Sequence, residues 1–504
     1  MLVARPEIKA PTPEHYVEVG SVTRKELSGA RIVVPAAMAP AGDDLLEQVL
    51  FALKHEGINL TILAQALPLI PEPDIRAAYD TSPTSQFLRK ACYLWEHFTG
   101  QQVQRQNNAS RSNYIPLFDP AKYLTGTEQR VTRWRILFNG LGSLDYCVTV
   151  RQTPELMSLL AKNLLQQASD FTDGLPAEIL NRTLAWAYLD ETRNTYAIEK
   201  EIPSGDKATR FVNLLKQAHK PHQLNENYLV DLQNAVISNA YYQAASFRGE
   251  QNYLSNGLRG ALGVTYVPPA PELARELMGQ LMALASTPAM STTPDHTPVE
   301  KTPAEGLDPL VLAAIISFGF VYIHPFMDGN GRLSRFLFHQ VLCQQGALEN
   351  GLLLPVSTVL KQQESAYKNV LEAYSDPIRE FWGITYIDEN QIEFDFSGHS
   401  ALYRYWDATQ CVIFMAQATE QAIEQHLKKE TLYLNRYDEI YRRINNVYDI
   451  ANVDLANLVV FCLDQHGTLS KNRRKQYQYK VPAEAFDAIE NAYQNVMADS
   501  QSTG

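Results

Sequence analysis

The sequence contains few cysteines and no long apolar stretch. Its five cysteines are scattered over 504 residues without metal-ligand spacing: Cys92, Cys147, Cys343, Cys411 and Cys462. This pattern predicts reduced thiols and argues against a disulfide framework or a zinc site. No apolar run reaches the roughly 18 residues that span a membrane, and the first residues lack the basic head and apolar core of a signal peptide. We therefore expect a cytoplasmic protein without a membrane partner.

Basic residues are outnumbered by acidic ones. The chain has 44 Lys and Arg against 56 Asp and Glu, a formal net charge of −12. This excludes general nucleic-acid binding over the whole surface, but it permits a local basic patch. The run Lys471-Asn472-Arg473-Arg474-Lys475 is either a solvated turn or part of a winged-helix-like module that contacts nucleic acid or a protein. Nucleic acid stays open as a partner, with nothing further to support it.

Apolar spacing predicts a mainly α-helical chain. Residues 85–100 read as an amphipathic helix, and 310–322 as a helix buried on all sides. Segments 114–118 and 146–150 are short strand candidates. Residues 286–302, with seven Ser or Thr and three Pro among seventeen, are the clearest linker. We expect an N-terminal accessory region (1–152), a central domain (153–385) and a C-terminal helical region (386–504).

Chemically useful side chains are densest in the twelve residues His324-Pro-Phe-Met-Asp-Gly-Asn-Gly-Arg-Leu-Ser-Arg335. Pro325 stops the preceding helix, so His324 lies at a helix end and faces a loop. Gly329 and Gly331 let backbone N–H groups converge into an anion site at the start of the next helix. The segment therefore predicts a phosphate site with a proton acceptor beside it.

The charged residues of the same segment suit a polyphosphate bound with a metal ion. Asp328 provides the single carboxylate that Mg²⁺ takes alongside phosphate oxygens. Arg332 and Arg335 are three residues apart on a helix, so both face one anion. No Gly-Lys-Ser/Thr follows the glycines, which excludes a Walker A loop, and the fifteen-residue spacing of His324 and His339 excludes a His-Glu-x-x-His zinc site.

The twelve residues match the signature His-x-Phe-x-Asp/Glu-Gly-Asn-Gly-Arg-x-x-Arg at every defined position, so the chain resembles Fic-domain proteins. The resemblance implies a helical Fic core that transfers AMP from ATP to a Ser, Thr or Tyr hydroxyl of a target protein, with ATP and Mg²⁺ as cofactors. It implies that His324 is the base and Asp328 the metal ligand. It further implies two phosphate-binding sets: the loop Gly329-Asn330-Gly331 for the inner phosphates, and Arg332 with Arg335 for the outer ones.

Residues 248–266 resemble the Fic flap, a β-hairpin that binds the target backbone by strand addition. The resemblance places Gln251, Asn252 and Tyr253 in the flap and implies a target protein as partner. The alternative is an ordinary glycine-rich hairpin.

The segment Thr195-Tyr196-Ala197-Ile198-Glu199-Lys200 resembles the inhibitory motif Ser/Thr-x-x-x-Glu-Gly/Asn of many Fic proteins. The resemblance implies that Glu199 pairs with Arg335, takes the place of the γ-phosphate and holds the enzyme inactive, with Thr195 as the first residue of the motif. Lys200 departs from the pattern, which has Gly or Asn there. The alternative is an ordinary surface Glu in a helix.

Other functions stay open at this point. A Fic site can move another phosphate-containing group, such as UMP or phosphocholine, and it can remove AMP. A third reading is a regulatory binding protein that only senses nucleotide and works through its basic tail. Some Fic proteins regulate the inhibitory helix through dimers, so a homo-oligomer is open too.

Overall fold

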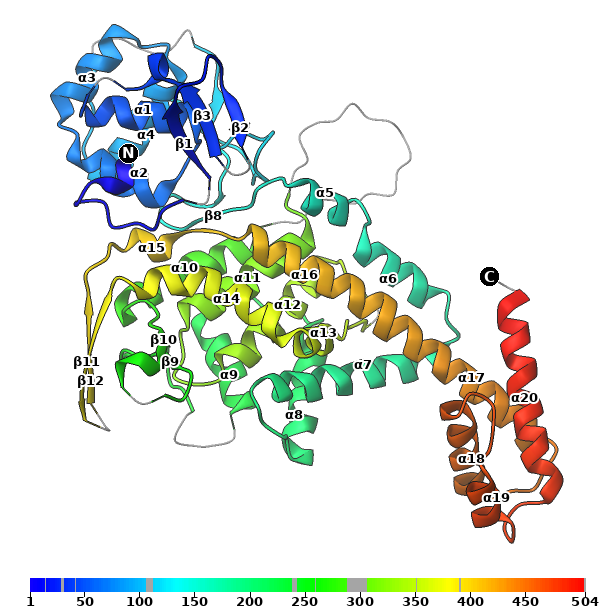
Figure 1. The fold of residues 1–504 in the computed structure, drawn as a ribbon. Helices are drawn as coiled ribbons and strands as arrows, with labels where there is room; N and C mark the ends of the chain where they lie inside the picture. The colour runs from blue at the N-terminus through cyan, green and yellow to red at the C-terminus, as the bar shows by residue number, and fades with distance from the viewer. Residues whose placement is uncertain are drawn as a thin grey trace.

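The computed structural model describes residues 1–502 except 14, 29–30, 41, 106–111, 238–242, 259, 288–305, 350 and 389–390. Helices dominate this part of the chain and the strands are short, which confirms the mainly α prediction (Figure 1). Most of the predicted linker 286–302 lies outside the described residues. None of the helices described has both the length and the apolar character needed to cross a membrane.

The N-terminal part of the chain packs α1 to α4 against small sheets (Figure 1). The predicted helix at 85–100 is present, with Ser85 capping its start and Gly100 ending it in the left-handed conformation. Three sheets have the strand orders β1-β3-β2, β4-β6-β5 and β13-β8-β7, where β13 is Tyr405–Asp407. The elements are α1 (Leu45–His55), α2 (Leu60–Ala66), α3 (Glu72–Thr81), α4 (Gln86–Thr99), β1 (Tyr16–Gly20), β2 (Glu26–Ser28), β3 (Arg31–Pro35), β4 (Ile115–Pro116), β5 (Gln129–Val131), β6 (Ile136–Phe138), β7 (Leu141–Gly142) and β8 (Cys147–Thr149).

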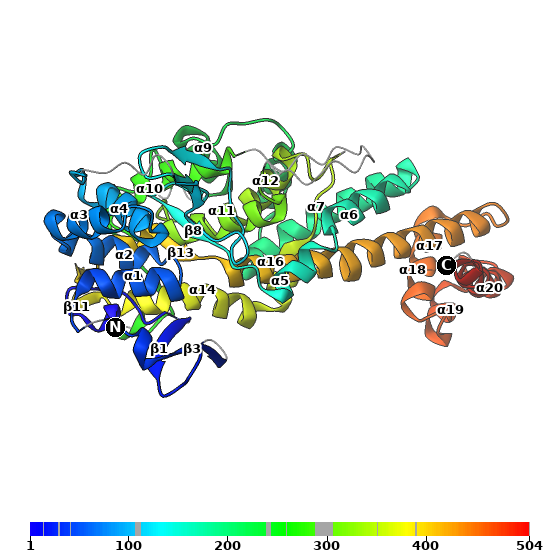
Figure 2. The ribbon, with the colours of Figure 1, turned by 90° about the horizontal axis from the view of Figure 1, so that it is seen from above.

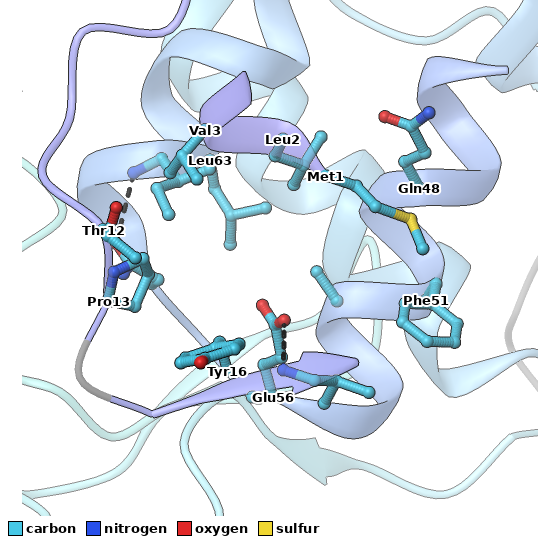
Figure 3. Close-up of a pocket in the computed structure, with 15 residues that line it drawn as sticks. Met1, Leu2, Val3, Thr12, Pro13, Tyr16, Gln48, Phe51, Glu56 and Leu63 are labelled. Atoms are coloured by element: carbon cyan, nitrogen blue, oxygen red, sulfur yellow. Dashed lines mark hydrogen bonds between the residues drawn. The ribbon is translucent and has the colours of Figure 1, made fainter. Parts of the chain in front are cut away.

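A cavity of about 90 Å³ lies in this N-terminal part, lined mainly by apolar side chains. Figure 3 shows Glu56 beside Tyr16 at its edge, where the backbone N–H of Val17 donates to Oε1 of Glu56 over 2.9 Å. Burial raises the pKa of Glu56. No lining residue comes from 324–335, so this cavity is separate from the motif.

The centre of the molecule is built around α11 (Pro309–Ile323). Asp308 caps its first turn, and nearly every side chain of the helix is buried, as the all-round apolar pattern predicts. The helix packs against α10 (Pro271–Ala285), α12 (Asn330–Gln344) and α16 (Thr409–Gln421). The two helices that flank the motif are therefore held by the main hydrophobic core.

Further helices complete this core, and α7 lies across α12 and α13 (Figure 1). Strand β13 pairs in parallel with β8 through Tyr405↔Cys147. This pairing joins the segment before residue 153 to the segment after residue 385. The remaining elements here are α5 (Pro154–Leu160), α6 (Leu164–Asp173), α7 (Ala177–Ile198), α8 (Gly205–Gln217), α9 (Glu226–Val236), β9 (Leu254–Ser255), β10 (Val264–Tyr266), α13 (Val356–Gln362), α14 (Glu364–Arg379), α15 (Ala401–Arg404) and β13 (Tyr405–Asp407).

A long hairpin that the sequence reading did not anticipate follows α14. Strands β11 (Trp382–Asp388) and β12 (Gln391–Phe396) are antiparallel, with Trp382 opposite Phe396 and Ile384 opposite Phe394. The ring of Phe394 lies 5.5 Å from the ring of Tyr253. The hairpin therefore stands beside the residues that lead into β9.

The C-terminal helices project away from the central part along α17, as Figure 2 shows. They enclose a core of their own that includes Ile440, Leu458 and Ile489. The basic run 471–475 lies on a short helix whose Arg474 pairs with Asp487 and Glu490. The elements are α17 (Lys428–Asn445), α18 (Asn452–Asp464), α19 (Lys471–Tyr477) and α20 (Ala483–Ser502).

Candidate functional site

The motif forms a loop between α11 and α12 that is fixed from inside. Phe326 is buried against Phe247 and Phe320. The Asn330 side chain closes the loop, because its Oδ1 accepts from Phe326 N over 3.0 Å and its Nδ2 donates to Phe326 O over 2.7 Å. The side-chain amide of Asn330, which the resemblance led us to expect at the phosphates, thus holds the loop instead.

His324 ends α11 in the left-handed conformation, with φ of 53°, because Pro325 cannot continue the helix. Its side chain is buried, and Nδ1 lies 3.2 Å from Val321 O. A carbonyl only accepts, so Nδ1 carries the proton and Nε2 keeps its lone pair. Burial lowers the pKa of His324 to about 4, so the ring is neutral near pH 7.

The start of α12 gathers the charged residues of the motif. Gly329 has a φ of 89°, a conformation that favours glycine, and its N–H donates to Asp328 Oδ1 over 2.6 Å. Arg332 Nη2 donates to the same oxygen over 3.1 Å. The Asp328 side chain is 44% exposed, so its carboxylate is open to a ligand from outside.

Glu199 and Arg335 form an ion pair in which Nη2 lies 2.6 Å from Oε1. Arg335 is almost fully buried, whereas about a third of the Glu199 side chain (35%) is exposed. Burial raises the pKa of Glu199, but Arg335 and then Arg332 lower it more, so the net pKa lies below the usual value. A Cβ added at Gly331 would overlap Oε1 of Glu199, which places this carboxylate directly on the first turn of α12.

Lys200 lies just beyond the end of α7, in the left-handed conformation. Lys200 has a φ of 59°, and the N–H of Glu201 donates to Tyr196 O over 3.0 Å, as in a Schellman helix end. Gly and Asn adopt that left-handed conformation with little strain, whereas Lys does not. The helix therefore ends at Ile198, and Lys200 just beyond it is in a strained conformation.

Thr195 is fully buried beneath this ion pair. Its carbonyl oxygen accepts from Arg335 Nη2 over 3.0 Å, and its hydroxyl accepts from Arg335 Nε over 3.3 Å. The structure thus brings Thr195, Glu199, Asp328, Arg332 and Arg335 together. His324 ends the preceding helix, α11.

The hairpin predicted at 248–266 is present, with Arg259 outside the described residues. Strands β9 and β10 pair through Ser255↔Val264 and Leu254↔Tyr266. Gln251 Nε2 donates to Pro268 O over 2.9 Å, and Asn252 Nδ2 donates to Phe326 O over 3.1 Å. Tyr253 is partly exposed beside the β11–β12 hairpin. Asn252 therefore fixes the base of the hairpin to the motif loop, and Gln251 ties the two ends of the hairpin together. Tyr253 is partly exposed.

Sequence reasoning missed several residues that shape the site. Glu201 Oε2 lies 3.4 Å from Arg332 Nη1. Arg248 is buried and donates from Nε to His324 O over 2.9 Å. Gln233 Nε2 donates to Asp328 O over 3.3 Å, and Arg379 Nε donates to Val264 O over 3.1 Å. In the sequence these are ordinary charged or amide residues outside the motif 324–335. Only the fold shows that they contact it or the hairpin beside it.

No group of three or more His, Cys, Asp or Glu side chains gathers as a metal site in the described part of the chain. The partly exposed Asp328 carboxylate before the start of α12 fits Mg²⁺, which takes its other ligands from phosphate and water. Arg332 Nε is a buried donor without a hydrogen-bond partner among the described residues, as expected of a group that awaits an anion.

Comparison with known proteins agrees with this geometry. The chain is 25% identical over 234 residues to "Protein adenylyltransferase Fic" of Nematostella vectensis, covering 46% of this chain and 41% of that protein. It is 30% identical over 183 residues to the protein of the same name from Drosophila virilis, covering 36% and 31%. The chain thus spans less than half the length of these relatives.

Among solved structures, a Fic family protein from Desulfovibrio desulfuricans G20 is similar with a TM-score of 0.39 and 18% identity, over 69% of this chain and 90% of that one. The model of the Fic/DOC family matches residues 223–342, a segment that contains the whole motif, both flap strands, α11 and most of α12. Residues 223–342 of this chain are therefore similar to the Fic/DOC family.

Proposed function

We propose that this protein is a protein adenylyltransferase that transfers AMP from Mg²⁺–ATP to a Ser, Thr or Tyr hydroxyl of a target protein, and that Glu199 holds it inactive. The observation that carries the proposal is the contact of the Glu199 carboxylate with Arg335 and the first turn of α12, beside a neutral His324. A carboxylate in that place marks an anion site, and the matched relatives are named adenylyltransferases.

His324 is the proposed general base. Its protonated Nδ1 is tied to Val321 O, so Nε2 is the nitrogen that accepts a proton. With a pKa of about 4 the imidazole is neutral at pH 7, so Nε2 is free to take the hydroxyl proton during attack. Arg248 holds the backbone of His324 from the other side and so fixes the position of the ring.

The proposed phosphate site is the start of α12 with its two arginines. First-turn N–H groups have no partner inside a helix, so they bind anionic oxygens. Arg332 and Arg335 would hold the outer phosphates, and Asp328 would hold Mg²⁺, which neutralises charge on the phosphates when bound. The Asn330 side chain holds the loop from inside, so its contribution to nucleotide binding is through backbone and loop shape.

The reaction that this arrangement supports is displacement at the α-phosphorus. The target hydroxyl oxygen forms a bond to the α-phosphorus, and the bond from that phosphorus to the bridging oxygen breaks. The hydroxyl proton passes to Nε2 of His324, and pyrophosphate leaves with its charge held by the two arginines.

The target protein is proposed to bind along the hairpin β9–β10. Leu254 and Ser255 of β9 are both exposed, so this strand is accessible to an added strand. Asn252 fixes the hairpin beside the motif loop, so a backbone bound along β9 would lie near His324.

The test uses ATP labelled at either the α- or the γ-phosphate, with the full-length Glu199→Gly variant. The proposal expects label from the α-position on protein and none from the γ-position. His324→Ala in the same background should abolish the transfer, and His97→Ala, which changes a surface histidine far along the chain, should not. Label from the γ-phosphate on the protein would show that the enzyme transfers a phosphoryl group, and the proposed adenylyl transfer would be wrong.

A further inference from the structure

A fully buried carboxylate lies beneath the Glu199–Arg335 pair. Glu191 on α7 is inaccessible to solvent, and its neighbours His339 and Ser357 are equally buried. Its Oε2 accepts from the backbone N–H of Ser357 over 2.8 Å, and its Oε1 accepts from the Ser357 hydroxyl over 2.5 Å and lies 3.0 Å from His339 Nε2. A carboxylate without solvent is costly unless such donors surround it, so this cluster is a specific arrangement.

The cluster continues to Arg335 through two hydroxyl groups. The Ser357 and Thr195 hydroxyl oxygens are 2.9 Å apart, and Arg335 Nε donates to the Thr195 hydroxyl oxygen over 3.3 Å. Each hydroxyl has one proton to donate. Since Ser357 gives its proton to Glu191, Thr195 must give its own to Ser357, and it is left with a lone pair for Arg335.

The direction of this chain is therefore fixed at both ends. It begins at a guanidinium that only donates and ends at a carboxylate that only accepts. Such charge-assisted hydrogen bonds are stronger than neutral ones, and successive bonds in one direction reinforce each other. Burial lowers the pKa of Arg335, but Glu199 above all, and Glu191 to a smaller extent, raise it beyond its usual value.

The consequence for Arg335 is orientation. Nε is held by the Thr195 hydroxyl and Nη2 by the Thr195 carbonyl, so the plane of the guanidinium is fixed before any ligand arrives. In the present state Nη2 also contacts Glu199. When Glu199 leaves, the chain through Thr195 and Ser357 remains and holds the guanidinium towards the start of α12.

We propose that Glu191 and Ser357 are positioning residues that orient Arg335 for the outer phosphates of the nucleotide. The inference rests on the proposed function and adds to it two residues that touch neither nucleotide nor target. Preorganised donors cost less to immobilise when the ligand binds, so the expected effect of losing the chain is weaker binding of the outer phosphates alone.

The first test compares the binding of ATP and AMP by calorimetry in the Glu199→Gly background. AMP lacks the outer phosphates, so it serves as the internal reference. Ser357→Ala removes one link of the chain, and we expect about five-fold weaker ATP binding, as for the loss of one hydrogen bond, with AMP binding unchanged. Glu191→Gln, which keeps the shape and removes the charge, should act in the same direction.

The matched control is Thr183→Val. Thr183 lies on the same helix and makes an equally buried hydroxyl contact, 3.2 Å from the Thr431 hydroxyl, but it is twelve residues before Thr195. Its loss should leave both nucleotides unaffected. Equal weakening of ATP and AMP by Ser357→Ala would show a general structural effect, and unchanged ATP binding in both Ser357→Ala and Glu191→Gln would overturn the proposal outright.

A second readout needs no nucleotide and so separates this proposal from the proposed function. The Nε–H proton of Arg335, assigned by NMR with an Arg335→Lys variant, should exchange slowly in the otherwise unchanged protein and rapidly in Ser357→Ala. If ATP and AMP bind the Glu199→Gly parent equally well, the outer-phosphate site is wrong but the proton exchange still decides whether the chain holds Arg335. Unchanged exchange in Ser357→Ala contradicts the orienting role.

Discussion

Glu201 and Arg332 form a second carboxylate–guanidinium contact two residues beyond Glu199, with Oε2 of Glu201 3.4 Å from Nη1 of Arg332. Both motif arginines thus face a carboxylate from the end of α7: Glu199 for Arg335 and Glu201 for Arg332. Both arginines proposed to bind the outer phosphates are thus paired with carboxylates in this structure.

Replacing Glu201 by Gln in the Glu199→Gly background should strengthen ATP binding. The Glu201 side chain is 40% exposed, so the competing pair is weak and the gain is about two- to five-fold in affinity. Calorimetry measures it, with Glu276→Gln as a control that removes a similarly exposed carboxylate from Arg404. Identical affinity in the Glu201 variant and its parent would mean that Glu201 does not compete with the nucleotide.

Replacing Lys200 by Gly should stabilise the protein. Lys200 has a positive φ that glycine adopts freely, so the substitution should add about 0.5–1 kcal/mol to the free energy of unfolding after the entropy cost of glycine. Arg193→Gly is the matched control, because Arg193 is an exposed residue within α7 and glycine there should destabilise by about 1 kcal/mol. Denaturant unfolding measures the free energy of unfolding of both variants. Equal destabilisation by the two substitutions would show that Lys200 is not strained.

The ring of His324 should titrate near pH 4, well below an ordinary histidine. Its folded pKa is lower than its unfolded value, so the unfolded state binds the proton more readily. Acidification from the ordinary value of 6.5 towards 4 should therefore lower stability, and His324→Ala should remove that part of the pH dependence. NMR of the ring protons gives the pKa directly, and titration between pH 6 and 7 would contradict the buried, neutral ring.

Replacing Tyr253 by Ala should weaken target modification while nucleotide binding is unchanged. Tyr253 is partly exposed at the start of the flap and touches Phe394 of the neighbouring hairpin. In the Glu199→Gly background we expect a several-fold higher KM for the target protein, with ATP affinity unaltered. Leu432→Ala on α17 removes a comparably exposed side chain elsewhere and should leave both quantities as they are. A loss of ATP affinity in Tyr253→Ala would place this residue at the nucleotide instead.

Sequence patterns predicted those parts of the fold that are determined by residues close together in the sequence. The apolar circumference of α11, the stop at Pro325 and the extent of α4 follow from residues within a few positions of one another. The β11–β12 hairpin was missed although Ile384, Phe394 and Phe396 alternate with polar residues, a period of two that favours strands.

The site was predictable where it is continuous in sequence and hidden where it is not. The spacing of Glu191, Thr195 and Glu199 by four residues places them on one face of a helix, so their alignment was readable. Ser357 and His339 reach Glu191 only through the packing of α13 and α12 on α7, and Arg248 reaches His324 across 76 residues. Sequence spacing carries no signal for contacts at that separation.

The central claim is that the Glu199–Arg335 pair holds back an AMP-transferring site. The most direct test is the intact mass of the protein after incubation with Mg²⁺–ATP, compared between the unchanged chain and Glu199→Gly. We expect adducts of one or more adenylyl groups on Glu199→Gly, far fewer on the unchanged chain and none on Glu199→Gly combined with His324→Ala. Equal masses before and after incubation for Glu199→Gly, or equal labelling with and without Glu199, would contradict it.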